Sequence, residues 1–83
     1  MGATHPKEFH RQAMQLIKVN KWDEAHCVIQ DYSDPLSCRI HGLLHRIEGD
    51  LSNAGYWYDR AGCEFPKINI DEELTALLEI SQP

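Results

Sequence analysis

The chain has 83 residues, of which 42% are apolar and 25% are charged, as in an ordinary small globular domain. Its net charge of −5 argues against a sequence-independent nucleic-acid partner, which requires a basic face, and against docking on an anionic membrane. No apolar run approaches the roughly 20 residues that span a bilayer. We therefore expect one domain over residues 1–83 that binds neither nucleic acid nor membranes.

The three cysteines, Cys27, Cys38 and Cys63, form no C-x-x-C pair, and their odd number indicates reduced thiols in a cytoplasmic protein. Cys27 follows His26 directly, but neighbouring residues on a helix point about 100° apart. A thiol activated by the adjacent imidazole is therefore the weaker interpretation. We expect all three cysteines to be small buried apolar side chains.

Apolar spacing predicts two helices in the first part of the chain. The first runs over about residues 6–19, with Pro6 in its first turn and Asn20 as a left-handed residue at its end. The second runs over about residues 22–31, and Pro35 then opens the next helix. The expected apolar face of the second helix comprises Trp22, Ala25, Val28, Ile29 and Tyr32.

Two more helices are predicted on either side of Gly49. The third runs over about residues 35–48 and ends at that glycine. The fourth runs over about residues 50–61, capped by Asp50 and ended by Gly62. Their expected apolar faces comprise Leu36, Ile40, Leu43, Leu44 and Ile47 in the third helix, and Leu51, Ala54, Trp57, Tyr58 and Ala61 in the fourth.

A last helix over about residues 70–80, capped by Asn69 or Asp71, completes an all-α chain. Residues 20–25 and 49–54 repeat one pattern, a turn followed by a large apolar residue and an alanine, at an offset of 29. This order resembles the tetratricopeptide repeat, whose period is about 34 residues. We therefore expect two tetratricopeptide-like helical hairpins plus a C-terminal capping helix, with an uncovered end that favours a homodimer.

A second resemblance covers residues 22–62. The pattern Trp-x-x-Ala-His-x-x-x-Gln begins at Trp22. The pattern His-x-x-x-His-Arg-x-Glu-Gly-Asp-x-x-Asn-Ala-x-Tyr-Trp-Tyr-x-Arg-Ala-Gly begins at His41. Together they resemble a family of small uncharacterised helical proteins, which have an aromatic residue where this chain has Ile40. The resemblance implies a helical fold and places the site in these motifs, and it implies no particular chemistry.

His41, His45 and Glu48 share one face of the predicted third helix, about 150° from its apolar face. Two histidines and a carboxylate at this spacing can ligate zinc or another divalent metal. The His-Glu-x-x-His pattern is absent, so a third ligand would have to come from elsewhere, with His26 as the candidate. The alternative is a stripe of solvated or hydrogen-bonded histidines that lines a groove or meets a partner.

His26 and Gln30 lie four residues apart on the second helix, beside its apolar face. Partly buried polar groups in that position need partners. One interpretation is a structural hydrogen bond from His26 to a backbone carbonyl or to a side chain of the third helix. The other is a pair that recognises a ligand.

Four polar residues, Arg46, Glu48, Asp50 and Asn53, surround the turn between the third and fourth helices. They predict a structural knot in which Arg46 reaches a carboxylate of the turn. The alternative is recognition of an anion or carboxylate by Arg46 near the positive start of the fourth helix. Tyr56 lies on the outer side of that helix, where an exposed tyrosine is typical of binding surfaces.

These patterns favour a small binding module without catalysis and without a cofactor, partnered by another protein or by a second copy. The alternative is a small enzyme or metal-binding protein that uses His26, His41, His45 and Glu48, with histidine as general base or a divalent metal as cofactor. Convergence of the three histidines would favour this alternative. No glycine-rich phosphate loop and no Ser-His-Asp spacing is recognisable. The candidate binding residues are His26, Gln30, His41, His45, Arg46, Glu48, Asn53 and Tyr56.

Overall fold

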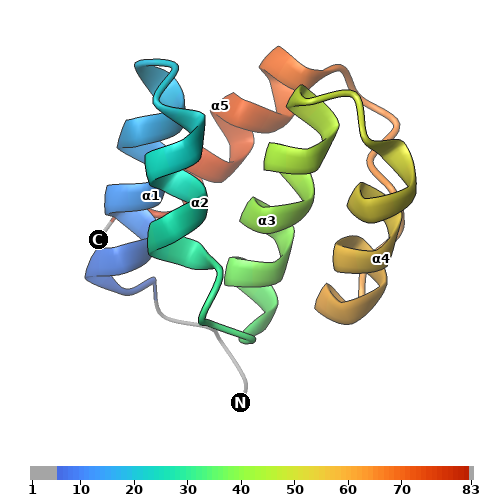
Figure 1. Ribbon diagram of the computed structural model, residues 1–83, viewed down its shortest axis with the longest axis horizontal. Helices are drawn as coiled ribbons and strands as arrows, with labels where there is room; N and C mark the ends of the chain where they lie inside the picture. The colour runs from blue at the N-terminus through green and yellow to red at the C-terminus, as the bar shows by residue number, and fades with distance from the viewer. Residues whose placement is uncertain (1–5, 83) are drawn as a thin grey trace.

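The computed structural model describes residues 6–82, and this range folds into five helices without a strand (Figure 1). The prediction of an all-α chain is confirmed. No helix in the described range is long and apolar enough to cross a membrane. The helices are α1 (Glu8–Lys18), α2 (Trp22–Ile29), α3 (Pro35–Ile47), α4 (Leu51–Ala61) and α5 (Ile70–Ile80).

Three turns contain a residue in the left-handed conformation, which the sequence predicted for Asn20, and two of them are the glycines predicted to end the third and fourth helices. Asn20, Gly49 and Gly62 have φ angles of 64°, 82° and 78°, respectively. Glycine enters this region without a steric cost, and asparagine is among the few other residues that visit it. These positions allow the chain to reverse after α1, α3 and α4.

Side-chain caps begin the last three helices. Asp34, Asp50 and Asn69 each accept a hydrogen bond from the backbone N–H three residues further along. The caps at positions 50 and 69 agree with the sequence prediction. Helix α1 is shorter than predicted, because it begins at Glu8 and leaves Pro6 outside. Helix α2 ends at Ile29, two residues earlier than expected.

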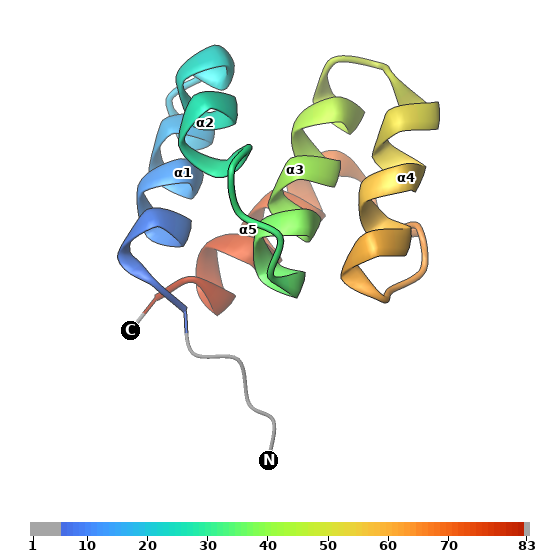
Figure 2. The same cartoon turned by 60° about the horizontal axis from the view of Figure 1, so that its bottom comes forward.

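The helices pair in chain order, α1 with α2 and α3 with α4, and α5 packs against both α1 and α3. Figure 1 shows the two pairs side by side with α2 next to α3, and Figure 2 shows α5 lying across α1 and α3. Helix α5 therefore joins the two pairs instead of covering only the end of the second. The central helix is α3, which contacts all four others.

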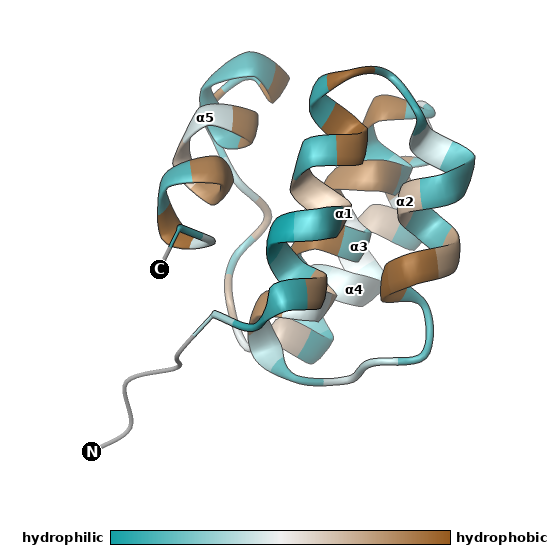
Figure 3. Cartoon of the chain, turned by 90° about the vertical axis from the view of Figure 1, so that its left-hand side faces the viewer, coloured by the Kyte–Doolittle hydropathy of each residue, from teal (hydrophilic) through white to brown (hydrophobic). Residues whose placement is uncertain are grey.

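The hydrophobic core lies between α1, α2, α3 and α5, and apolar and polar segments alternate along these helices (Figure 3). The backbone of α4 lies close to that of α3 alone, so α4 buries a narrower stripe than predicted. Leu51 is 59% exposed and Trp57 is only half-buried, against the expectation that both face the core. The fully buried apolar side chains include Met14, Ile29, Ile40, Leu43, Leu44, Tyr58 and Leu77.

The expectation that all three cysteines are buried is wrong for two of them. Cys38 is buried, Cys63 is half-buried and Cys27 is exposed. All three thiols are free. Burial raises the pKa of the Cys38 and Cys63 thiols, which keeps both groups protonated and unreactive near neutral pH.

Candidate metal centre

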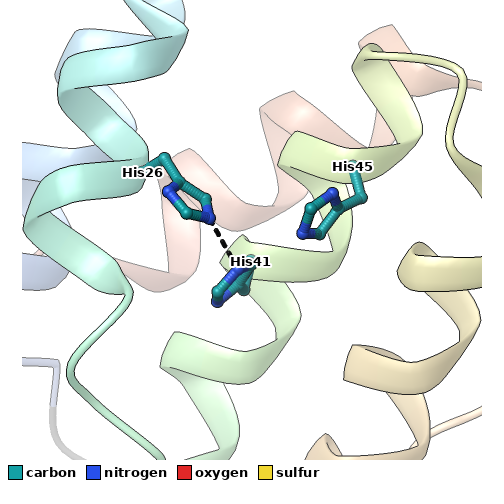
Figure 4. Close-up of side chains that lie close together, drawn as sticks. All are labelled: His26, His41 and His45. Atoms are coloured by element: carbon teal, nitrogen blue, oxygen red, sulfur yellow. Dashed lines mark hydrogen bonds between the residues drawn. The ribbon is translucent and has the colours of Figure 1, made fainter.

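Three histidines from two helices converge between α2 and α3 (Figure 4). His41 and His45 lie on successive turns of α3, and His26 comes from α2. The Nε2 atoms of His26 and His41 are 3.0 Å apart. One potential ligand atom from each of the three side chains lies within 4.8 Å of the other two. The bond from His26 to a side chain of the third helix agrees with one of the two sequence interpretations.

The two histidines of the polar stripe on α3 are not solvated, which was one of the sequence interpretations, and His41 is hydrogen-bonded to His26, which was another. His41 is 3% exposed, and His45 is half-buried. The reason is the central place of α3, which has α2 alongside it as well as α4, α1 and α5. A helix with neighbours on several sides buries its polar face together with its apolar face.

An aromatic stack fixes the orientation of His41. The ring of Trp57 lies parallel to the His41 ring, with centroids 3.8 Å apart and an interplanar angle of 11°. The guanidinium carbon of Arg60 lies 5.0 Å from the Trp57 centroid. Trp57 is therefore a component of this site, although the sequence placed it in the core.

The environment of His41 keeps its imidazole neutral. Burial lowers the pKa of His41 to about 4, and the nearby His26, His45 and Arg60 act in the same direction. A neutral imidazole retains the nitrogen lone pair that coordinates a metal ion.

Two ring nitrogens of the cluster have no hydrogen-bond partner within residues 6–82. The Nδ1 atoms of His41 and His45 are both buried and unpartnered among the described residues. Glu48 Oε1 lies 3.4 Å from His45 Nδ1, which is within ion-pair distance but outside hydrogen-bond geometry. Metal-bound histidines commonly direct their second nitrogen to a carboxylate, so Glu48 is placed to orient His45.

The spacing of the rings fits a small divalent ion. Zinc binds imidazole nitrogen at about 2.0–2.1 Å in tetrahedral geometry, which places neighbouring ligand nitrogens roughly 3.3 Å apart. The 3.0 Å between His26 and His41 is close to that value. The three ligand atoms lie within 4.8 Å of one another, so the rings would have to move closer together to bind one ion.

The remaining residues predicted for the site lie elsewhere. Gln30 is exposed at the end of α2. Asn53 donates to Asp50 at 2.7 Å, a local contact within the turn. Tyr56 is 53% exposed, as predicted, and its hydroxyl accepts a long hydrogen bond of 3.5 Å from Arg60.

Arg46 does not reach a carboxylate of the turn, so the predicted polar knot lacks its arginine. Its Nη1 donates to Glu73 Oε1 at 2.9 Å, and its Nη2 donates to the carbonyl of Ile68. Tyr58 donates from its hydroxyl to both oxygens of Glu73 at 2.7 Å. Burial and the Glu73 carboxylate raise the pKa of Tyr58 far above its usual value. This cluster ties α5 to α3 and α4.

The partner of Arg46 was not predicted from the sequence. Glu73 is 1% exposed, although an acidic residue in the first turn of a helix ordinarily complements the positive end of that helix from the surface. Its position three residues after Ile70 and four before Leu77 places it on the apolar face of that helix. That spacing is a signal for burial, but nothing local identifies Arg46 as its partner.

A Ser-His-Asp cluster also forms, although the spacing of its members along the chain does not indicate one. His10 Nε2 lies 2.7 Å from Asp34 Oδ2, and Ser37 Oγ donates to Asp34 Oδ1 at 2.6 Å. The Lys7 N–H donates to His10 Nδ1, so the ring proton resides on Nε2 and His10 cannot accept the serine proton there. The cluster is a structural clamp between α1 and α3, and no nucleophile is activated.

No family model, curated protein or solved structure matches the chain. The resemblances to the tetratricopeptide repeat and to the small helical family therefore stay predictions from the sequence.

Proposed function

We propose that this protein binds a divalent transition metal ion through His26, His41 and His45, with zinc as the first candidate. The observation that supports the proposal is the convergence of three imidazoles from two helices. This is the geometry that favours a metal-binding protein over a module whose histidines point separately into solvent. Imidazole donors suit zinc, copper and nickel better than calcium or magnesium, which prefer oxygen.

The proposal is tested by loading the full chain with Zn²⁺ after removal of metal by a chelator. We expect one ion per chain by native mass spectrometry and by calorimetric titration. His26→Gln and His45→Gln remove one ligand each at half-buried positions, and each variant is expected to bind Zn²⁺ at least about tenfold more weakly. His5→Ala removes a histidine outside the described residues and serves as the matched control.

The fluorescence of Trp57 provides an independent measurement of metal binding. Its ring stacks on His41, so a paramagnetic ion at the cluster should quench its fluorescence. Trp22→Phe removes the other tryptophan, which is 39% exposed. In this variant Cu²⁺ should quench the fluorescence of Trp57. Loss of the quenching when His26→Gln is added would support the proposal. Equal affinity in the parent and in both ligand variants would refute it.

The binding module without catalysis is the second candidate, and the exposure of Tyr56 is the observation that favours it. This second candidate is a tetratricopeptide-like module that binds another protein or a second copy of itself as a homodimer. The free thiols are compatible with the cytoplasm, which stays part of the proposal as well. A dimer in native mass spectra that Tyr56→Ala dissociates would support this candidate, whereas a monomer at all concentrations would count against self-association.

A further inference from the structure

The donor set of the metal centre carries no negative charge. Among residues 6–82, the cluster comprises His26, His41 and His45, and no cysteine or acidic side chain joins it. Neutral imidazoles leave the charge of a divalent ion uncompensated. Zinc held by three protein ligands also keeps a fourth position for a ligand from outside the chain.

The charges around the cluster do not neutralise the ion either. Glu48 lies beyond His45, with its carboxylate oxygen 3.4 Å from Nδ1. The Arg60 guanidinium packs over the Trp57 ring, which separates it from His41, and it adds a positive charge. Asp50 is fully exposed and accepts hydrogen bonds from Asn53, so water screens its charge.

The Arg60 guanidinium has N–H donors without a partner among the described residues. The side chain is exposed, and its guanidinium packs over the rings of Tyr56 and Trp57. Within the described range, its side chain makes one hydrogen bond, the 3.5 Å contact with the Tyr56 hydroxyl. A guanidinium has five N–H donors, so several remain available for an anion.

Solvent reaches the cluster on the side of its two half-buried histidines, His26 and His45. His26 and His45 are both partly exposed, whereas His41 is covered by Trp57. An ion held by the three nitrogens would therefore have its vacant position on the side that reaches solvent.

We infer that the ion takes a small anion, such as a carboxylate or azide, as its fourth ligand, and that Arg60 attracts this anion to the site. The inference rests on the proposed metal centre and adds the class of ligand that completes it. The anion would coordinate the ion through an oxygen or nitrogen atom on the side of His26 and His45. The positive charge of Arg60 would attract it from beyond the Trp57 ring.

Cobalt makes the fourth ligand visible, because tetrahedral Co²⁺ absorbs in the visible range and its bands shift when a ligand is exchanged. We expect the Co²⁺-loaded protein to show such bands and to change them saturably on titration with sodium azide, and with acetate. Arg60→Gln should weaken azide binding about two- to fivefold at low salt, the range expected for an exposed charge. Arg11→Gln, which makes the same charge change at the exposed pair with Glu8, should leave azide binding unchanged.

The outcomes separate this inference from the proposed function. Absence of tetrahedral Co²⁺ bands would refute the metal centre and the inference with it. Bands that form with the parent affinity but ignore azide and acetate would refute the inference alone. A molar absorptivity of the Co²⁺ bands that rises with protein concentration, together with a dimer in native mass spectra, would assign the fourth ligand to a second copy. That result would also refute the inference. Equal azide affinity in Arg60→Gln and the parent would remove Arg60 from the site.

Discussion

Gly42 lies directly against the ring of Tyr58. A Cβ atom built at position 42 would lie 2.9 Å from two carbons of that ring. The ring has no room to retreat, because its hydroxyl donates to both oxygens of the buried Glu73. The absence of a side chain at position 42 therefore sets how closely α3 and α4 approach.

Gly42→Ala should destabilise the protein by about 1–3 kcal/mol, the usual cost of adding a methyl group to a filled core. Urea denaturation followed by circular dichroism measures the change. Gly55 provides the matched control, because it is also helical but nothing lies within 4 Å of a Cβ atom built there. Gly55→Ala should stabilise the protein by up to about 1 kcal/mol. Equal effects at the two positions would contradict the close approach.

Arg46→Ala should destabilise the protein by about 3–5 kcal/mol, because it leaves the Glu73 carboxylate buried without its cation. The Arg46 and Glu73 side chains are 13% and 1% exposed. Arg11 forms an ion pair of similar length with Glu8, but that carboxylate is 80% exposed. Arg11→Ala should therefore cost less than about 1 kcal/mol. Comparable losses for the two arginine variants in the same urea experiment would rule out a buried ion pair.

Stability should fall as the pH rises above about 10, the usual pKa of tyrosine in an unfolded chain. The pKa of Tyr58 is raised in the folded protein by burial and by Glu73, so the folded state keeps this proton while the unfolded state releases it. The contribution is fully present below about pH 10 and is lost above it. Chemical denaturation at about pH 8 and about pH 10.5, on either side of that pKa, measures the difference. Tyr58→Phe should lose much of this alkaline dependence, although its stability at the lower pH also falls.

The helix positions could be predicted because their signals are local. Apolar spacing, the caps at Asp50 and Asn69, and the left-handed residues Asn20, Gly49 and Gly62 act within a few residues of where they stand. The predicted ends of α1 and α2 were less accurate, since helix ends depend on a balance of weaker contacts.

The candidate site could be predicted only in part, because burial depends on which helices become neighbours. His41 lies on the polar side of its own helix, and only the placement of α2 and of Trp57 covers it. Arg46 meets a buried carboxylate 27 residues away in the chain, a distance over which helical periodicity carries no information. The spacing of His41 and His45 therefore indicates which histidines share a face, whereas their surroundings depend on contacts between distant helices.

Metal binding should raise the free energy of unfolding, because the ligands come from both helix pairs and are together only in the folded state. At a free Zn²⁺ concentration about one hundred times the dissociation constant, the gain is about 2.7 kcal/mol. For a domain of this size, that corresponds to an increase in Tm of roughly 10–20 °C. Differential scanning calorimetry with and without Zn²⁺ measures this increase.

The site of this stabilisation can be located by hydrogen exchange. Since His26 is on α2 and His41 and His45 are on α3, Zn²⁺ should slow exchange in these two helices more than in α4, which supplies no ligand. Since His26→Gln is expected to weaken binding at least about tenfold, it should reduce the increase in Tm to about half or less at the same Zn²⁺ concentration. It should also reduce the added protection, whereas His5→Ala should preserve both. An increase in Tm that His26→Gln leaves unchanged would mean that the ion binds elsewhere and that the 3.0 Å contact between His26 and His41 is a structural hydrogen bond.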